Sequence, residues 1–344
     1  QMMKTTWLGI LLTVFAAQAW AQVGELVNAE VIDRTTLSDP AEAMEAVEGQ
    51  WLAFEVPAMG GTRSPCCRKG QWNATGEVGC SLENRHQSYG THSGFPLTDS
   101  VIVFSEIRDG QVYRLRVVGE TCPVEGNGAT VHWLGDVDNK AGLDWLQALA
   151  GADSHDRAGA QALHALALHA SERAGERLQS LALEADNDLA EEAIFWLGEA
   201  RAEKGFKLLK NLLSKLPDGD RRRSINFALS QNNTAPAAEL LLAISKSDHD
   251  PEQRAGAMFW LAQEYPQQAR GWLLEVVETE QDEDVLERAV FAISQLPDGD
   301  GDRLLLQLAR NEQVPRHVRR QALFWLANSD NDDSIAALAE LLAR

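Results

Sequence analysis

The chain has 344 residues, with 51 acidic and 31 basic side chains and a formal net charge of −20 at pH 7. An acidic surface of this kind repels nucleic acid and anionic lipid, so neither is an expected partner. The length suggests two domains. Near residue 140 the sequence changes from strand-like to helical patterns, and we take this position as the boundary between the two domains.

Residues 2–21 have the three parts of a secretory signal peptide. Lys4 supplies the positive start, residues 7–17 form an apolar run, and Ala19 and Ala21 provide a small-residue cleavage site. The apolar run is too short to span a membrane, and no later stretch has the ~20 apolar residues that a membrane helix needs. We therefore predict a periplasmic or secreted protein without membrane insertion, cleaved before Gln22.

Residues 22–140 are predicted to form a small antiparallel β domain. Asp109-Gly110 separates two runs rich in Val and Ile, which is a strong hairpin signal. Residues 59–97 have the composition of a long loop. A loop of this length in a compact domain is expected to be held by a cross-link or to have a function. We expect strands at residues 51–56, 101–107, 112–118 and 130–134.

All four cysteines lie in this domain, at Cys66, Cys67, Cys80 and Cys122. An even number of cysteines in an exported chain favours disulfide bonds. A bond between the adjacent Cys66 and Cys67 would close a strained ring, so each is expected to pair with Cys80 or Cys122. Two connectivities remain open.

The same loop allows a second interpretation. Together with His86 and His92, Cys66, Cys67 and Cys80 could bind zinc or copper, because thiolate and imidazole suit these ions. A disulfide between the adjacent cysteines could instead act as a redox switch. The spacing matches no standard zinc motif and no Cys-x-x-Cys pattern. We therefore predict structural disulfides with no metal and no cofactor, and keep a redox or metal-binding protein as the alternative.

The second part of the chain repeats with a period of about 32 residues. A phenylalanine anchor recurs at Phe195, Phe227, Phe259, Phe291 and Phe324. A leucine anchor keeps the same spacing at Leu209, Leu241, Leu273, Leu305 and Leu338. Two anchors in step predict stacked helix pairs rather than one globular enzyme core.

Residues 141–344 are predicted to hold about six such pairs, the first of them divergent, as a terminal repeat should be. The first helices are expected at residues 156–169, 187–199, 219–231, 251–263, 283–295 and 315–327. The second helices are expected at residues 172–183, 202–215, 235–246, 267–279, 301–310 and 332–343. Aspartates that recur at the helix starts are expected to act as N-caps, at positions Asp186, Asp218, Asp250, Asp282 and Asp284.

The segment 250–254, Asp-Pro-Glu-Gln-Arg, followed by Ala257 and Leu261, resembles the HEAT-like repeat family, in particular the short repeats first described in phycobilisome lyases. The resemblance covers about residues 150–344. It implies a right-handed α-solenoid whose concave face contacts proteins. Members that resemble deoxyhypusine hydroxylase bind two iron ions through His-Glu pairs, and this sequence contains no His-Glu dipeptide.

The residue after the phenylalanine anchor alternates between small and large: Ala165, Trp196, Ala228, Trp260, Ala292 and Trp325. One interpretation is that the two sizes interdigitate between neighbouring helices, as close packing requires. The other is an aromatic ladder that anchors an extended polypeptide or glycan. Trp196, Trp260 and Trp325 are therefore the candidate residues of a binding face.

No catalytic constellation can be assigned from spacing, because the sequence offers no ordered Ser-His-Asp set, phosphate loop or paired-carboxylate cleft. We predict that the chain is not an enzyme. The favoured function is a mainly α-helical exported scaffold that binds another protein through the concave face of its solenoid.

Overall fold

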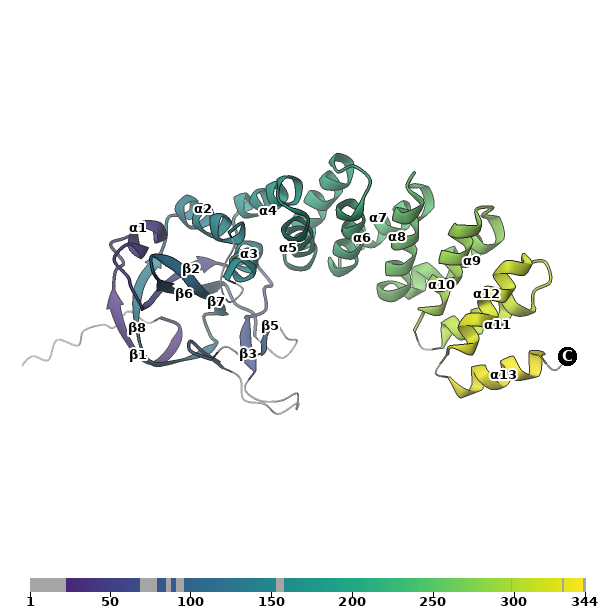
Figure 1. Cartoon of the computed structure of the whole chain (residues 1–344), viewed down its shortest axis with the longest axis horizontal. Helices are drawn as coiled ribbons and strands as arrows, with labels where there is room; N and C mark the ends of the chain where they lie inside the picture. The colour runs from purple at the N-terminus through teal and green to yellow at the C-terminus, as the bar shows by residue number, and fades with distance from the viewer. Residues whose placement is uncertain are drawn as a thin grey trace, which may run out of the picture.

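The computed structural model describes residues 23–68, 79–84, 88–90, 96–152, 158–297, 299–329 and 331–342. The predicted signal peptide, His86 and His92 lie outside the described residues. A sheet comes first along the chain, and helix pairs follow it in an arc that ends at the C-terminus (Figure 1). The described chain is mainly helical, as predicted.

Six strands form the main sheet in the order β1-β8-β2-β6-β7, with β4 also pairing with β8. Their bounds are Glu25–Asp33 (β1), Trp51–Pro57 (β2), Cys80–Ser81 (β4), Ser100–Arg108 (β6), Gln111–Gly119 (β7) and Pro123–Asp136 (β8). Cys66–Arg68 (β3) and Ser88–Gly90 (β5) form a separate antiparallel pair.

The prediction of an antiparallel domain is wrong for half of this sheet. Strands β2, β6 and β7 are antiparallel neighbours, as the Asp109-Gly110 turn predicts. After that hairpin, however, β8 enters the middle of the sheet and runs parallel to β1, β2 and β4. The sheet is therefore mixed, because the chain crosses over to place β8 between β1 and β2.

Each face of the sheet has its own apolar layer, as the alternation of side chains along a strand requires. Leu52 and Phe54 of β2 face the helices and join a core that contains Leu163. Trp51 and Ala53 face the other side, where they pack in a second core with the four cysteines. Both faces are thus covered, one by helices and one by the disulfide-bonded segments.

The helices have the following bounds: Pro40–Met44 (α1), Asn139–Ala150 (α2), Ala158–Leu168 (α3), Glu172–Glu184 (α4), Asn187–Lys215 (α5), Asp220–Gln231 (α6), Ala235–Ser247 (α7), Pro251–Glu264 (α8), Pro266–Thr279 (α9), Glu283–Ser294 (α10), Asp300–Arg310 (α11), Arg316–Ala327 (α12) and Asp332–Leu342 (α13). From α3 onward these helices make up the predicted pairs. The second pair lies within α5, which contains non-helical backbone at Ala202.

The bend at Ala202 divides α5 into the two helices of the second pair. Ala202 has φ 42° and ψ −128°, outside the helical region. The Asn232 amide of the next pair donates to the carbonyl oxygens of Gly198 at 3.1 Å and Ala202 at 2.9 Å. Gly198 is required here, because a Cβ atom would lie 2.0 Å from the carbonyl oxygen of Ala228. The second and third pairs are therefore in close backbone contact.

The sheet and the first helix pair share one hydrophobic core, which crosses the predicted boundary at residue 140. Beyond β2, the Met59 N–H donates to Leu168 O and the Ala170 N–H donates to Pro57 O, each at 2.8 Å. Ala58 and His169 form a β-bridge between these bonds. The end of α3 is therefore bonded to the end of β2. The division into domains at residue 140 stays a prediction.

Arg201 of α5 also stabilises the region where the end of α3 meets the sheet. Its guanidinium, 1 % exposed, donates to the carbonyl oxygens of Ala167, His169 and Ser171. The carbonyls of Ala167 and His169 lie at the C-terminal end of α3, where a cation is favourable, and Ser171 is the N-cap residue of α4. Burial lowers the pKa of the Arg201 guanidinium to about 10, which leaves it charged at neutral pH.

The aspartates predicted as caps do not all act as caps. Asp186, Asp250 and Asp282 accept hydrogen bonds from the first turns of α5, α8 and α10. Asp218 does not: Gly219 is the N-cap residue of α6, and Asp218 instead forms an ion pair with Arg222 and a hydrogen bond with His249. Asp284 lies within the first turn of α10.

Candidate binding face

The aromatic side chains of the first helices form one continuous row, which we call the aromatic file. Successive ring centroids lie 4.5–5.8 Å apart, within the range of favourable ring contacts. In order of contact, the aromatic file consists of His164, Trp196, Phe195, Phe227, Trp260, Phe259, Phe291, Trp325 and Phe324. It extends from α3 to α12.

The alternation of alanine and tryptophan explains how the aromatic file is built. Ala165, Ala228 and Ala292 are fully buried, so each leaves room for a neighbouring indole. Each indole contacts the preceding repeat: Trp196 stacks on His164, Trp260 lies against Phe227, and Trp325 lies against Phe291. Each indole therefore packs against the aromatic anchor of the repeat before it, and interdigitation with the alanines stays a prediction.

The same rings remain partly accessible to solvent. Trp196, Trp260 and Trp325 are all partly buried, as are Phe195 and Phe227, and Phe324 is 56 % exposed. The indole Nε1 atoms of Trp196 and Trp325 are themselves buried and have no hydrogen-bond partner among the described residues. A row of rings that packs along one side and reaches solvent on the other can serve as a binding surface. Its role as one stays a prediction.

Two cavities lie along the aromatic file. The first, of about 460 Å³, has walls formed by His164 and Trp196 and by the segment 60–63 that follows β2. The second, of about 470 Å³, lies at Phe291 and Trp325. Three carboxylates, those of Glu252, Asp284 and Glu287, line the second cavity with one guanidinium, that of Arg288. The rings are thus flanked there by excess negative charge.

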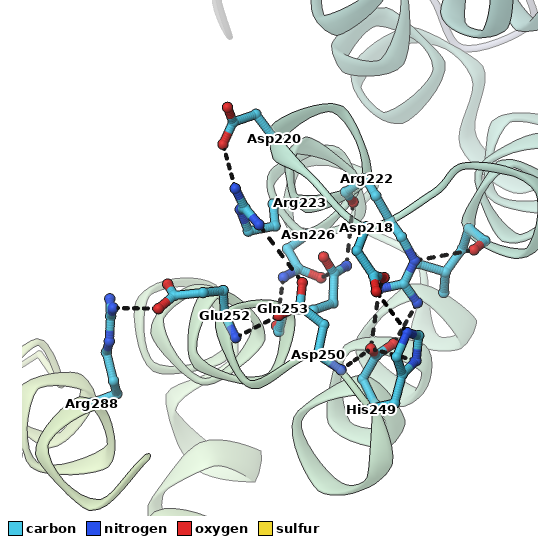
Figure 2. Close-up of polar contacts among 12 residues, drawn as sticks. Asp218, Asp220, Arg222, Arg223, Asn226, His249, Asp250, Glu252, Gln253 and Arg288 are labelled. Carbon is cyan, nitrogen blue, oxygen red and sulfur yellow. Dashed lines mark hydrogen bonds and ion pairs between the residues drawn. The ribbon is translucent and has the colours of Figure 1, made fainter. Parts of the chain in front are cut away.

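A polar network joins α6 to α8 and to the segment before α8 (Figure 2). Arg222 makes a two-point contact with Asp248, with Nη1–Oδ1 at 3.1 Å and Nη2–Oδ2 at 2.6 Å. The buried amides of Asn226 and Gln253 bond to each other at 3.1 Å, and Asn226 also donates to the Gln253 carbonyl oxygen at 2.9 Å. These contacts fix the third and fourth pairs relative to each other.

The electrostatics of this network favour its ionised form. Burial alone would raise the pKa of Asp248, but hydrogen bonds from Arg222 and from the Asp250 N–H, together with the nearby positive charge, lower it overall. The neighbouring His249 contacts Asp218 at 2.9 Å with a side chain that is 72 % exposed. A solvated pair of this kind contributes little to stability. We therefore regard the network as structural support for the aromatic file.

The cysteines form two buried disulfides, Cys66–Cys122 and Cys67–Cys80. The prediction of disulfide bonds is confirmed, and the structure selects one of the two connectivities that the sequence left open. Although the sulfur atoms of Cys66, Cys80 and Cys122 lie within 4.8 Å of one another, all are oxidised. They offer no thiolate to a metal ion, and the adjacent cysteines are not bonded to each other. The structure therefore does not favour the redox or metal-binding alternative.

No protein-family model matches the sequence, and no curated protein is significantly similar to it. Among solved structures, the chain is similar to human deoxyhypusine hydroxylase in complex with glycerol, with a TM-score of 0.31 and 16 % identity over 58 % of this chain and 88 % of that one. It is also similar to Kap121p, with a TM-score of 0.35 and 15 % identity over 55 % of this chain and 25 % of that one. TM-scores this low transfer no activity or partner to this chain.

The first of these comparisons corrects one prediction. Deoxyhypusine hydroxylase is an enzyme by name and belongs to a branch of the repeat family that the sequence resembles. The inference from helical repeats to a protein without catalytic activity is therefore wrong. What is supported is the coarser statement of a HEAT-like helical repeat fold. The short lyase type and the right-handed superhelix stay predictions.

Proposed function

We propose that this protein is a scaffold that binds another protein along the aromatic file of its helix pairs. The observation that carries the proposal is the unbroken row of rings from the buried His164 to Phe324, in which the phenylalanine and tryptophan rings are all at least partly exposed. Aromatic side chains with one packed side and one accessible side are favoured anchors in protein interfaces. In HEAT-like arrays such contacts are expected on the concave side, which stays a prediction for this chain.

Charge supports the choice of partner. The chain carries a net charge of −20, and Glu252, Asp284 and Glu287 line the cavity at Phe291 and Trp325. A partner segment with basic side chains beside apolar ones would complement both the rings and the carboxylates. Nucleic acid and anionic lipid would be repelled.

We also propose that the protein acts outside the cytosol. The two disulfides support this, because such bonds persist mainly in oxidising compartments. Among the described residues, none of the helices combines the length and the apolar character needed to cross a membrane. The predicted signal peptide at residues 2–21 would direct export.

Site-specific photo-crosslinking tests the binding face. Gln263 is exposed on α8, one turn after Phe259 and therefore on the same side of the helix. Glu275 is exposed on α9 of the same pair. A photo-reactive phenylalanine at position 263 of the full chain should yield one defined crosslinked protein, whereas the same residue at position 275 should not.

Mass spectrometry identifies the captured protein, and titration with the purified chain then gives its affinity. The variant Trp325→Ala should weaken that binding by about tenfold, as the loss of an interface anchor does. Capture of the same protein from positions 263 and 275 alike would contradict the proposal. So would unchanged affinity in a folded Trp325→Ala variant.

A further inference from the structure

A cavity of about 780 Å³ lies where the sheet meets the first helix pair, away from the aromatic file. Its walls come from the C-terminal ends of β2 and β8, the start of β6, the turn after β7 and the segment that follows α3. This volume is within the range of sites that hold small molecules or short peptides. The backbone bonds between Met59 and Leu168 and between Ala170 and Pro57 hold the helix side of the cavity against the sheet.

Carboxylates from four separate segments line this cavity. Glu55 and Asp136 are register partners on the parallel strands β2 and β8. Glu120 follows β7, and the Ser100 hydroxyl holds it in place by donating to Oε2 at 2.9 Å. Asp99 precedes β6. No lysine or arginine belongs to the described lining, so the cavity favours a cation.

His169 provides a second and independent constraint on the ligand. Its side chain is 3 % exposed and lines the cavity. The Ser171 N–H donates to Nδ1 at 3.1 Å, so Nδ1 carries no proton and Nε2 carries one. Burial, with the nearby charge of Arg201, lowers the pKa of His169 to about 4, which keeps this neutral tautomer at neutral pH. No acceptor for the Nε2–H is found among the described residues.

Together the carboxylates and the protonated Nε2 of His169 restrict the kind of ligand that the cavity can bind. A metal ion would need an unprotonated Nε2, which the Ser171 N–H contact disfavours. The ammonium group of a lysine side chain could pair with the carboxylates. It carries no hydrogen-bond acceptor nearby, however, that could accept the Nε2–H of His169. The amino terminus of a peptide brings both, because its first carbonyl oxygen lies beside the ammonium group.

We propose that this cavity binds the free amino terminus of a peptide. The ammonium group lies among the carboxylates of Glu55, Glu120 and Asp136, and the first carbonyl oxygen accepts the Nε2–H of His169. The site is separate from the proposed protein-binding face, and either could exist without the other.

Calorimetric titration of the full chain tests this assignment. The probes are trialanine amide with a free amino terminus, the same peptide with an acetylated amino terminus, and the chlorides of calcium and zinc. We expect the free peptide to bind and acetylation to weaken binding by at least about tenfold, which corresponds to losing one charge-assisted contact. Neither metal ion should displace the peptide.

Three variants complete the test. Glu120→Gln keeps the shape of the side chain and should weaken binding by about tenfold, and His169→Phe should weaken it to a similar extent. Glu42→Gln makes the same charge change on exposed α1, outside the cavity, and should bind as the wild type does. The proposal would be overturned if the acetylated peptide bound equally well or if neither peptide bound. It would also be overturned if a metal ion displaced the peptide, or if a folded Glu120→Gln variant bound it fully.

Discussion

The indole ring of Trp260 lies 4.6 Å from the phenyl ring of Phe227, centroid to centroid, and joins α8 to the preceding helix pair. Phe227 also stacks on Phe195, with centroids 5.6 Å apart. One ring therefore contacts both the pair before it and the pair after it. The stability of a repeat array depends on such contacts between neighbours.

Phe227→Ala should lower the free energy of unfolding by about 3 kcal/mol, because it removes a packed ring and leaves a gap between two pairs. Urea unfolding followed by circular dichroism measures the change. Phe324→Ala is the matched control: Phe324 is 56 % exposed, and its change should stay below about 1 kcal/mol. Equal losses in the two variants would contradict the role assigned to Phe227.

Arg222→Met should lower the free energy of unfolding by about 3 kcal/mol, because it leaves the buried carboxylate of Asp248 without its partner. Arg223→Met removes an arginine from the next position, where the side chain is 35 % exposed and pairs with Asp220 and Asp250. That control should cost less than about 1 kcal/mol. The lowered pKa of Asp248 adds stability at neutral pH that is lost as the pH falls below about 3.9.

The buried His164 predicts a pH dependence. Burial lowers its pKa in the folded chain to about 4, whereas an unfolded histidine titrates near 6.5. Between these values the unfolded state binds a proton that the folded state does not, so the free energy of unfolding should fall as the pH drops from 6.5 to 4. His164→Phe keeps a ring against Trp196 and should reduce this dependence by about half, because the buried His169, whose pKa is also lowered to about 4, contributes the rest. Urea titrations at several pH values measure the free energy of unfolding. If its dependence on pH were the same in the variant as in the wild type, the role assigned to His164 would be disproved.

Ala202→Gly should stabilise the protein by about 1 kcal/mol. Ala202 has φ 42° in the bend of α5, where a side chain is strained and glycine is not. Ala200→Gly, two residues earlier and inside the helix, should destabilise by about 1 kcal/mol. Thermal melting of the two variants checks both signs, and a lower melting temperature for Ala202→Gly would refute the prediction.

The two disulfides should contribute unequally to the free energy of unfolding. Cys66–Cys122 spans a sequence separation of 56 residues, and Cys67–Cys80 spans 13. Closing the longer loop removes more entropy from the unfolded chain, so replacing Cys66 and Cys122 by serine should cost about 1 kcal/mol more than replacing Cys67 and Cys80. Guanidinium unfolding of the two double variants compares them, and the reverse order would be inconsistent with this account.

The helix pairs could be predicted because every repeat buries an equivalent face, so the same residue types return at fixed spacing. Phe195, Phe227 and Phe259 follow this rule, and the structure places them in one row. The repeat period predicted a break between the helices at residues 187–199 and 202–215, and α5 bends there at Ala202. The positive φ of Ala202 could not be predicted, because no glycine occupies that position. Asp218 was predicted to be a cap, but Arg222 and His249 compete for its carboxylate.

The sheet was harder to predict, because strand pairing is not local. The first strand, β1, has mostly exposed or partly exposed side chains and gives no clear apolar alternation. Its partner β8 lies about a hundred residues later in the sequence. The carboxylates of Glu55 and Asp136 become neighbours only through the parallel pairing of β2 with β8. No spacing in the sequence could have indicated the cavity that they line.

One apolar core runs from Phe54 of the sheet through Leu163 of α3 to the later helices. Separating the sheet from these helices would expose the apolar side chains of both to water. We therefore expect the strands and the first helices to unfold as a single cooperative unit, which differential scanning calorimetry would record as one heat-absorption peak.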